Sequence, residues 1–170
     1  MEQEEKFMKE ALKLAKKAAA EGEVPVGCVV VCDGKIVGRG RNRRETKKTA
    51  LGHAEVEAIS KACKKLGGWR LHRCDLYVTL EPCPMCTGAI LNARIRRVYY
   101  GAADEKAGTC GTRMNLFDFG FNHRSEIIGG VLEEACRAEL QAFFVALRER
   151  KKQEKLARRQ QAEKENPEAL

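Results

Sequence analysis

The chain has 170 residues, and its 32 Lys and Arg against 24 Asp and Glu give a formal net charge of +8 at neutral pH. A domain of this length can bury a full core without crosslinks, and the charge favours an anionic partner such as nucleic acid. The longest apolar run, 24–32, is broken by Pro25 and Gly27 and is too short to cross a bilayer. The charged N-terminus lacks a secretory core. We therefore expect a cytoplasmic protein whose eight cysteines are thiols.

Apolar periodicity predicts alternating helices and strands in the first half of the chain. Phe7, Ala11 and Leu14 recur at helical spacing, and residues 24–32 are rich in β-branched side chains. Asp33-Gly34 is a two-residue turn signal. We expect a helix over 2–21, strands over 24–32 and 35–39, a basic loop over 41–52 and a helix over 53–66.

The second half is predicted to hold further strands and two helices. We expect strands over 75–80, 96–101 and 126–130, a helix over 84–93, a long Gly-rich loop over 102–124 and a helix from Leu132. The last helix has an apolar face of Cys136, Leu140, Phe143, Phe144 and Leu147. This order predicts an α/β fold with a sheet between helical layers, and the Asp33-Gly34 hairpin makes the sheet mixed.

The apolar pattern ends at Leu147, and the remaining sequence has no apolar face wide enough to pack. We divide the chain into a globular domain, 1–150, and a basic tail, 151–170, expected to be partly disordered or a solvated, frayed helix. The basic segments 41–48 and 148–159 are candidates for phosphate binding. For the tail, a merely solvated surface is an equally good interpretation.

Two short segments, His53-Ala54-Glu55 and Pro82-Cys83-Pro84-Met85-Cys86, carry the chemistry. One imidazole and two thiolates are good Zn²⁺ ligands, and a catalytic zinc site keeps three protein ligands and leaves the fourth position to water. Both segments begin predicted helices, where free N–H groups and the helix dipole favour thiolate. Cys83 and Cys86 lie three residues apart, so both sulfurs can face one point.

Glu55 is the candidate general base beside this site. Two thiolates neutralise the metal and reduce how far it acidifies its water, so a nearby base becomes necessary. In a regular helix, residues 53 and 55 point about 200° apart. Both serve one site only if His53 lies at the very start of its helix, which the preceding Gly52 permits.

Other interpretations of these residues remain open. A C-x-x-C pair also occurs in structural zinc sites and redox centres. A structural site needs a fourth ligand, and none lies at the usual spacing. The candidates are scattered along the chain: His72, Cys74 and Cys110. The combination of residues favours catalytic zinc over structural zinc, and either over a site without metal.

The chain also resembles the bacterial tRNA-specific adenosine deaminases of the zinc-dependent cytidine deaminase superfamily. His-Ala-Glu with Pro-Cys-x-x-Cys is the signature of the zinc nucleobase deaminases. The likeness extends over about residues 5–150 through EVPVGCVVV, GRGRN, LYVTLEPCPMCTGAI, GAADEKAGTCGT and FNH. The resemblance implies a three-layer α/β/α, cytidine-deaminase-like fold with a mixed five-stranded sheet, and makes 1–150 a zinc-dependent deaminase domain. It also implies a homodimer whose active sites lie near the subunit contact.

The same resemblance implies an activity and a set of catalytic residues. The reaction would be hydrolytic deamination of adenosine to inosine at the wobble position of a tRNA anticodon, with arginine tRNA as the expected substrate. One zinc ion per subunit would be held by His53, Cys83 and Cys86. Glu55 would transfer the proton from the attacking water to the substrate.

Contacts to the RNA are implied for three further residues. Asn42 would hydrogen-bond the target base, and Asp104 and Asn122 would contact the anticodon loop. Asn42 is also typical of a turn residue that caps its own backbone. The alternating phenylalanines of 117–121 fit a strand, a dimer contact or a base-stacking surface, and packing in the core or a dimer is the favoured account.

Competing functions differ in substrate and in the need for catalysis. A zinc-dependent deaminase of a free base or nucleoside (guanine, cytosine or cytidine) is the main alternative, although a small neutral substrate needs no basic surface. A non-catalytic RNA-binding subunit with structural zinc would be expected to lack Glu55, which is present. Editing of messenger RNA or DNA stays open, because such a pocket reads one base and a few neighbours.

Overall fold

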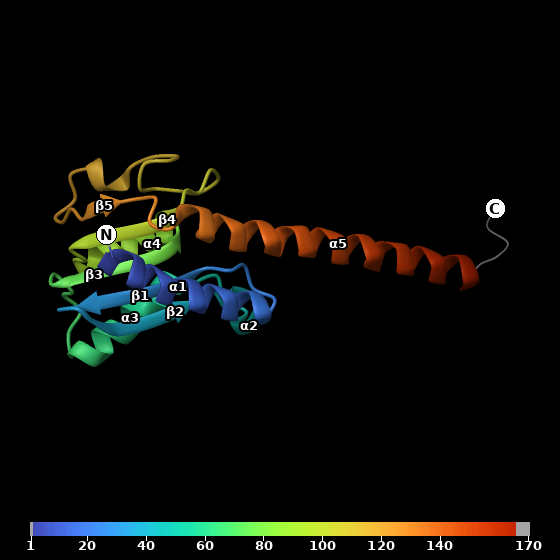
Figure 1. Cartoon of the computed structure of the whole chain (residues 1–170), viewed down its shortest axis with the longest axis horizontal. Helices are drawn as coiled ribbons and strands as arrows, with labels where there is room; N and C mark the ends of the chain where they lie inside the picture. Colours follow the sequence, from blue (N-terminus) through green and yellow to red (C-terminus); the bar gives the residue numbers. More distant parts are fainter. Residues whose placement is uncertain (1, 166–170) are drawn as a thin grey trace.

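Residues 2–165, which the computed structural model describes, form one five-stranded sheet between two layers of helices (Figure 1). The elements are α1 (Glu2–Ala20), β1 (Gly27–Cys32), β2 (Lys35–Arg41), α2 (Arg44–Lys47), α3 (Ala54–Leu66), β3 (Cys74–Leu80), α4 (Pro84–Ala93), β4 (Arg97–Ala102), the 3₁₀ turn η1 (Leu116–Asp118), β5 (Glu126–Ile128) and α5 (Glu133–Glu165). The strand order is β2-β1-β3-β4-β5. Its first two pairings are antiparallel and its last two parallel. The predicted α/β class, layering and mixed sheet are confirmed.

The hairpin that makes the sheet mixed is set by two residues. Asp33 and Gly34 both have positive φ, 47° and 74°, which is the conformation of a two-residue hairpin turn. β1 pairs with β2 on one side and with β3 on the other. Its apolar run therefore lies in the interior of the sheet, as its composition predicts.

Two loop regions differ from the prediction. The basic loop over 41–52 contains the short helix α2, which sequence periodicity could not reveal in four residues. In the long loop over 102–124, Phe117 is buried in η1, whereas Phe119 and Phe121 are exposed. The alternating phenylalanines are therefore not a strand.

The two faces of the sheet are covered by different helices. α1 and the start of α5 pack around Phe7, Met8 and the stacked rings of Tyr77 and Tyr99. α3 and α4 cover the opposite face around a core that includes Ile90. Because α3 and α4 are neighbours on one face, residues from their N-terminal ends can meet.

Glycines in β2 let α3 approach the sheet very closely. A Cβ on Gly38 would lie 2.1 Å from the Ala58 carbonyl oxygen, and one on Gly40 would lie 2.0 Å from the Ala54 carbonyl oxygen. Neither position has room for a side chain. The small residues of β2 and α3 thus fix the first turn of α3, which lies directly after His53.

The last helix leaves the domain and projects from it (Figure 1). Cys136 is buried and Leu140 packs beside α1, but Phe144 is 39% exposed and every residue of 148–165 is exposed. The predicted apolar face is therefore wrong at Phe144, whereas Phe143 and Leu147 are half-buried, because no second element in the described chain covers this face fully. The expected solvated helix is continuous to Glu165, and the rest of the predicted tail, 166–170, lies outside the described residues. None of the helices within 2–165 is long and apolar enough to span a membrane.

Candidate active site

Two helix N-termini bring His53, Cys83 and Cys86 together. His53 is the N-cap of α3 and Cys83 is the N-cap of α4, both with extended backbone. Pro84 begins α4, where its missing N–H costs nothing, and Cys86 follows in the first turn. His53 Nδ1 lies 3.6 Å from Cys83 Sγ and 3.5 Å from Cys86 Sγ. Within residues 2–165, this is the one group of three or more His, Cys, Asp or Glu residues placed to hold a metal ion.

The spacing of these three atoms fits a zinc ion. Zinc lies about 2.3 Å from a sulfur ligand and about 2.0–2.1 Å from a nitrogen ligand. In tetrahedral geometry, a nitrogen and a sulfur bound to the same zinc ion are therefore about 3.6 Å apart. The observed separations agree with that value. A hydrogen bond from the Cys86 thiol, reinforced by His53, lowers the pKa of Cys83 to about 4. Cys83 is therefore ready to bind as a thiolate, and the Cys86 proton would be released when a metal binds.

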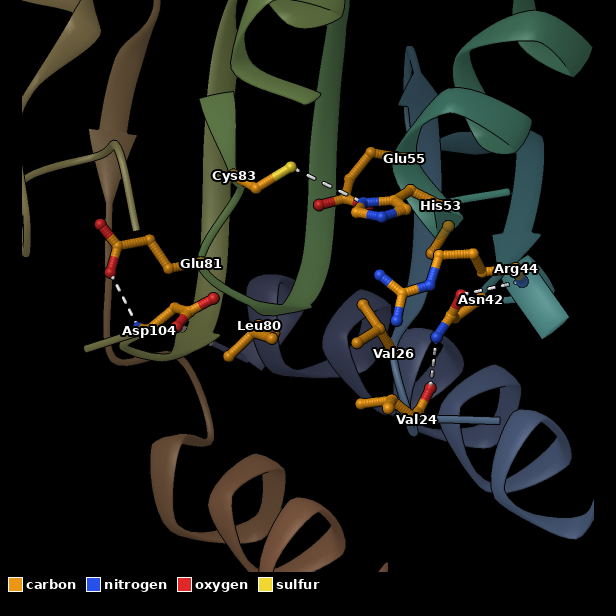
Figure 2. A pocket seen from close by; sticks show the side chains of 11 residues that line it. Val24, Val26, Asn42, Arg44, His53, Glu55, Leu80, Glu81, Cys83 and Asp104 are labelled. Carbon is orange, nitrogen blue, oxygen red and sulfur yellow. Dashed lines mark hydrogen bonds between the residues drawn. The ribbon is translucent and has the colours of Figure 1, made fainter. Parts of the chain in front are cut away.

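Glu55 faces the same pocket from the first turn of α3. Because His53 is a cap outside the regular helix, its ring and the Glu55 carboxylate lie beside each other (Figure 2). The prediction that His53 lies at the very start of its helix is confirmed. Glu55 is only 4% exposed, and this burial raises its pKa to about 7. A carboxyl group that exchanges its proton near neutral pH is suited to acid–base chemistry.

The pocket has a volume of about 140 Å³ and combines a polar rim with an apolar wall. In Figure 2, Asn42 and Arg44 lie on one side, and Asp104 with Glu81 on the other. The apolar lining consists of Val24, Val26, Ala54 and Leu80. A flat, uncharged ring bordered by hydrogen-bonding groups is the kind of ligand that such a lining accepts.

Asn42 occupies the pocket rim and also caps the local backbone. Its Nδ2 donates to the Val24 carbonyl at 3.2 Å, and its Oδ1 accepts from the Arg44 N–H at 3.2 Å. The turn-capping interpretation is thus correct, and it does not exclude the pocket position. These two bonds fix the amide in one orientation, while a primary amide retains a second N–H and a second lone pair for a ligand.

Asp104 is positioned by Glu81, a residue that sequence reasoning missed. The Glu81 side chain is 2% exposed and accepts hydrogen bonds from the backbone N–H groups of Asp104, Cys110 and Thr112 at 2.9–3.1 Å. Asp104 in turn caps its own turn, accepting from the N–H groups of Lys106 and Ala107. The available signal was an acidic residue between a buried strand and Pro82.

A second buried carboxylate holds the opposite rim. Glu23 is 1% exposed and accepts from the N–H and hydroxyl of Thr46 at 2.6 and 2.8 Å, and from the Glu45 N–H at 3.3 Å. It therefore ties α2 to the segment before β1. This contact orders the basic loop and keeps Arg44 at the pocket.

Asn122 is not brought to this pocket. It is exposed and lines a separate groove with Leu91 of α4 and Phe121. Phe119 and Phe121 are 65% and 56% exposed, with stacked rings 6.3 Å apart. Six of the seven predicted site residues thus surround one pocket or its ligand cluster, and the seventh lies elsewhere on the monomer.

A His-x-Glu turn facing a Pro-Cys-x-x-Cys turn beneath a mixed sheet defines a nucleobase deaminase of the zinc-dependent type. The profile of the MafB19-like deaminase family matches residues 2–148, and the chain belongs to this family.

Relatives within the family carry a more specific name. The chain is 53% identical over 153 residues to the tRNA-specific adenosine deaminase of Bacillus subtilis, covering 89% of this chain and 95% of that protein. It is 47% identical over 154 residues to the protein of the same name from Haemophilus influenzae, covering 89% of each.

Solved structures show the same fold. One from a study of A-to-I editing by tRNA:A34 deaminases superposes with a TM-score of 0.73 and 42% identity, over 79% of this chain and 98% of that chain. A guanine deaminase from Bacillus subtilis superposes with a TM-score of 0.56 and 46% identity, over 58% of this chain and 64% of that chain.

Proposed function

We propose that this protein converts adenosine to inosine by hydrolytic deamination at the wobble position of a tRNA anticodon. The observation that carries the proposal is the pocket in which Glu55 faces His53 and Cys83, in a chain 53% identical to a tRNA-specific adenosine deaminase. The net charge of +8 agrees with an RNA substrate. Arginine tRNA is the expected substrate.

Zinc is the proposed cofactor, one ion per subunit, held by His53, Cys83 and Cys86. When bound, it would act as a Lewis acid that makes a water molecule nucleophilic near neutral pH. The Glu55 carboxylate accepts a proton from that water and delivers it to the ring nitrogen beside C6 of adenine. The water oxygen bonds to C6 and still carries its second hydrogen. Glu55 takes that proton and passes it to the amino nitrogen as the bond from C6 to this nitrogen breaks, so C6 becomes a carbonyl carbon and the amino group leaves as ammonia.

The RNA would reach this pocket as a single-stranded loop. Bases of an anticodon loop can be splayed into a pocket without breaking a duplex. Two backbone contacts fix the Asn42 amide at the pocket rim, and in this proposal it would hydrogen-bond the base. Arg44 is exposed at the rim, where it can contact phosphate, and Asp104 can contact a neighbouring nucleotide.

A homodimer is part of the proposal. Phe119 and Phe121 expose a stacked aromatic pair next to the groove on α4 that contains Asn122. Burial of this aromatic surface against a second copy would remove an apolar patch from water. Asn122 would then lie near the subunit contact, from which it could reach RNA bound across both subunits.

The decisive experiment incubates the purified protein with total bacterial tRNA and sequences the product for A-to-G changes. A single change at a wobble position supports the proposed reaction and also identifies the tRNA. Ammonia release from free adenosine, guanine or cytosine at rates matching those on tRNA would overturn it. Salt separates the same two cases, because activity on RNA should fall steeply between about 50 and 200 mM salt and activity on a neutral base should not.

Free guanine is the necessary comparison in that experiment, because a guanine deaminase shares the fold. Discrimination between guanine and adenosine would depend on the rim residues of the pocket, Asn42 and Asp104. Equal turnover of guanine and tRNA by the same preparation would favour the small-substrate alternative.

A further inference from the structure

The projecting part of α5 carries most of its positive charge on one side: six of the eight basic residues of 148–165 lie there. Six basic residues occur at positions i, i+3, i+4, i+7, i+10 and i+11 of a continuous helix. With about 100° of rotation per residue, they fall within an arc of about 120°. We call this face the α5 basic stripe, and its members are Arg148, Lys151, Lys152, Lys155, Arg158 and Arg159.

Acidic residues of the same segment lie outside that arc. By the same rotation, Glu149 and Glu154 lie about 60° and about 40° beyond its edges. Glu163 and Glu165 lie past the C-terminal end of the stripe, each about 20° beyond an edge. The ion pair of this segment, Arg150 with Glu154 at 4.0 Å, also lies off the stripe. No stripe side chain forms an ion pair with another residue of 2–165, and all six residues are exposed. Six like charges along about 17 Å of helix repel each other unless an anion compensates them.

We propose that the α5 basic stripe binds phosphates of the tRNA substrate that lie outside the anticodon loop, an inference that rests on the proposed function. α5 begins against β4, whose last residues lead to Asp104 at the pocket. From there the helix runs outward from the domain (Figure 1). At 1.5 Å per residue the stripe begins about 22 Å from the start of α5. It is therefore placed to contact backbone at a distance from the nucleotide in the pocket.

The composition of the helix argues against two other occupants. A membrane surface would require an apolar face to insert, but Leu156 is the one large apolar residue between 148 and 165, and it lies off the stripe. The stripe of a second copy of this chain carries the same positive charge and would repel it. A polyanion without an apolar face, such as an RNA backbone, complements it best.

Most of the α5 basic stripe lies outside the domain that the family profile matches. The family profile ends at residue 148, so five of the six basic residues lie beyond it. The catalytic pocket lies wholly within the profile. We therefore expect the stripe to contribute affinity for whole tRNA and to leave the chemical step unchanged.

The test compares full-length variants in which the helix is kept. One replaces all six stripe residues by Gln, which has a helix propensity close to that of Lys and Arg. Two double variants remove the same amount of positive charge. The on-stripe pair is Lys151→Gln with Lys155→Gln, and the off-stripe pair is Arg150→Gln with Lys164→Gln. The dissociation constant of full-length tRNA is measured between 50 and 200 mM salt, and deamination is measured on a short anticodon-loop oligonucleotide. Circular dichroism checks that each variant keeps its helix.

The six-residue variant should bind full-length tRNA about tenfold or more weakly at low salt. Its plot of log affinity against log salt should be shallower by about one unit for each lost phosphate contact. The on-stripe pair should show part of this loss and the off-stripe pair almost none, while turnover of the oligonucleotide stays unchanged in all variants.

Equal effects of the two pairs, or an unchanged salt slope in the six-residue variant, would overturn the proposal. Binding to vesicles of phosphatidylcholine and phosphatidylserine is measured with the same variants. Loss of vesicle binding in the six-residue variant without loss of tRNA binding would overturn the proposal in favour of a membrane surface. Because the binding measurement does not require turnover, it gives its answer even if the proposed deamination fails.

Discussion

Three buried glutamates near the candidate active site differ in role because their surroundings differ. Glu23 and Glu81 each accept several hydrogen bonds from backbone N–H groups of distant segments. Their charge is therefore satisfied within the protein, and they position loops. Glu55 instead faces His53 and Cys83, and burial raises its pKa. Of the three, Glu55 is the one suited to exchange a proton with a ligand.

Replacement of Glu55 separates catalysis from metal binding. Glu55→Ala should lower kcat on tRNA by about 10²–10⁴-fold, the usual contribution of a general acid–base group. Zinc content should stay near one ion per chain, because the proposed ligands are unchanged. Elemental analysis and single-turnover deamination measure the two properties on the same sample. Loss of zinc together with activity would show that Glu55 is a ligand and would refute this division of roles.

Helix α3 is positioned by its contact with β2, and this contact depends on the absence of a side chain. The Ala54 carbonyl oxygen lies only 2.0 Å from the position that a Cβ of Gly40 would take, and Ala54 stands between His53 and Glu55 in the chain. A shift of the first turn of α3 therefore moves a proposed ligand and the proposed base together.

Two Gly→Ala substitutions test this packing. Gly40→Ala should destabilise the protein by about 1–3 kcal/mol through overpacking and should weaken zinc binding as α3 shifts. Gly68→Ala is the matched control, since a Cβ there meets nothing within 4 Å and this glycine does not have a positive φ. Thermal unfolding and zinc titration measure both effects. If Gly40→Ala melts at the wild-type temperature and keeps its zinc affinity, close packing of α3 does not position the site.

In the whole molecule, a bound metal would join the N-termini of α3 and α4. His53 comes from one helix cap and Cys83 and Cys86 from the other, so the proposed zinc site links two segments that are 30 residues apart in sequence. A ligand that binds the folded state alone stabilises it in proportion to the logarithm of its concentration over its dissociation constant.

Removal of zinc should therefore affect stability as well as activity. Treatment with a strong chelator at neutral pH should abolish deamination and lower Tm by about 6–12 °C, and added zinc should restore both. Differential scanning calorimetry on the treated and reloaded protein measures the shift. A Cys63→Ala variant, which removes a thiol remote from the proposed ligands, should behave like wild type. Active protein that contains no zinc, or an unchanged Tm after chelation, would contradict the cofactor assignment.

Features with a local physical cause could be predicted from the sequence. The Asp33-Gly34 turn, the helix beginning at Pro84 and the apolar run of β1 each depend on residues close together in the chain. The three proposed ligands could also be predicted, because each lies at or near a helix start that the sequence marks.

Other features were decided by contacts between distant segments. Glu81 is 23 residues from Asp104 and 29 from Cys110, and Glu23 is 23 residues from Thr46, so no local pattern shows that these carboxylates hold the pocket rims. The placement of Asn122 away from the pocket and the exposure of Phe144 on α5 have the same origin. Periodicity shows which face of an element is apolar, whereas the packing of the whole chain decides whether anything covers that face.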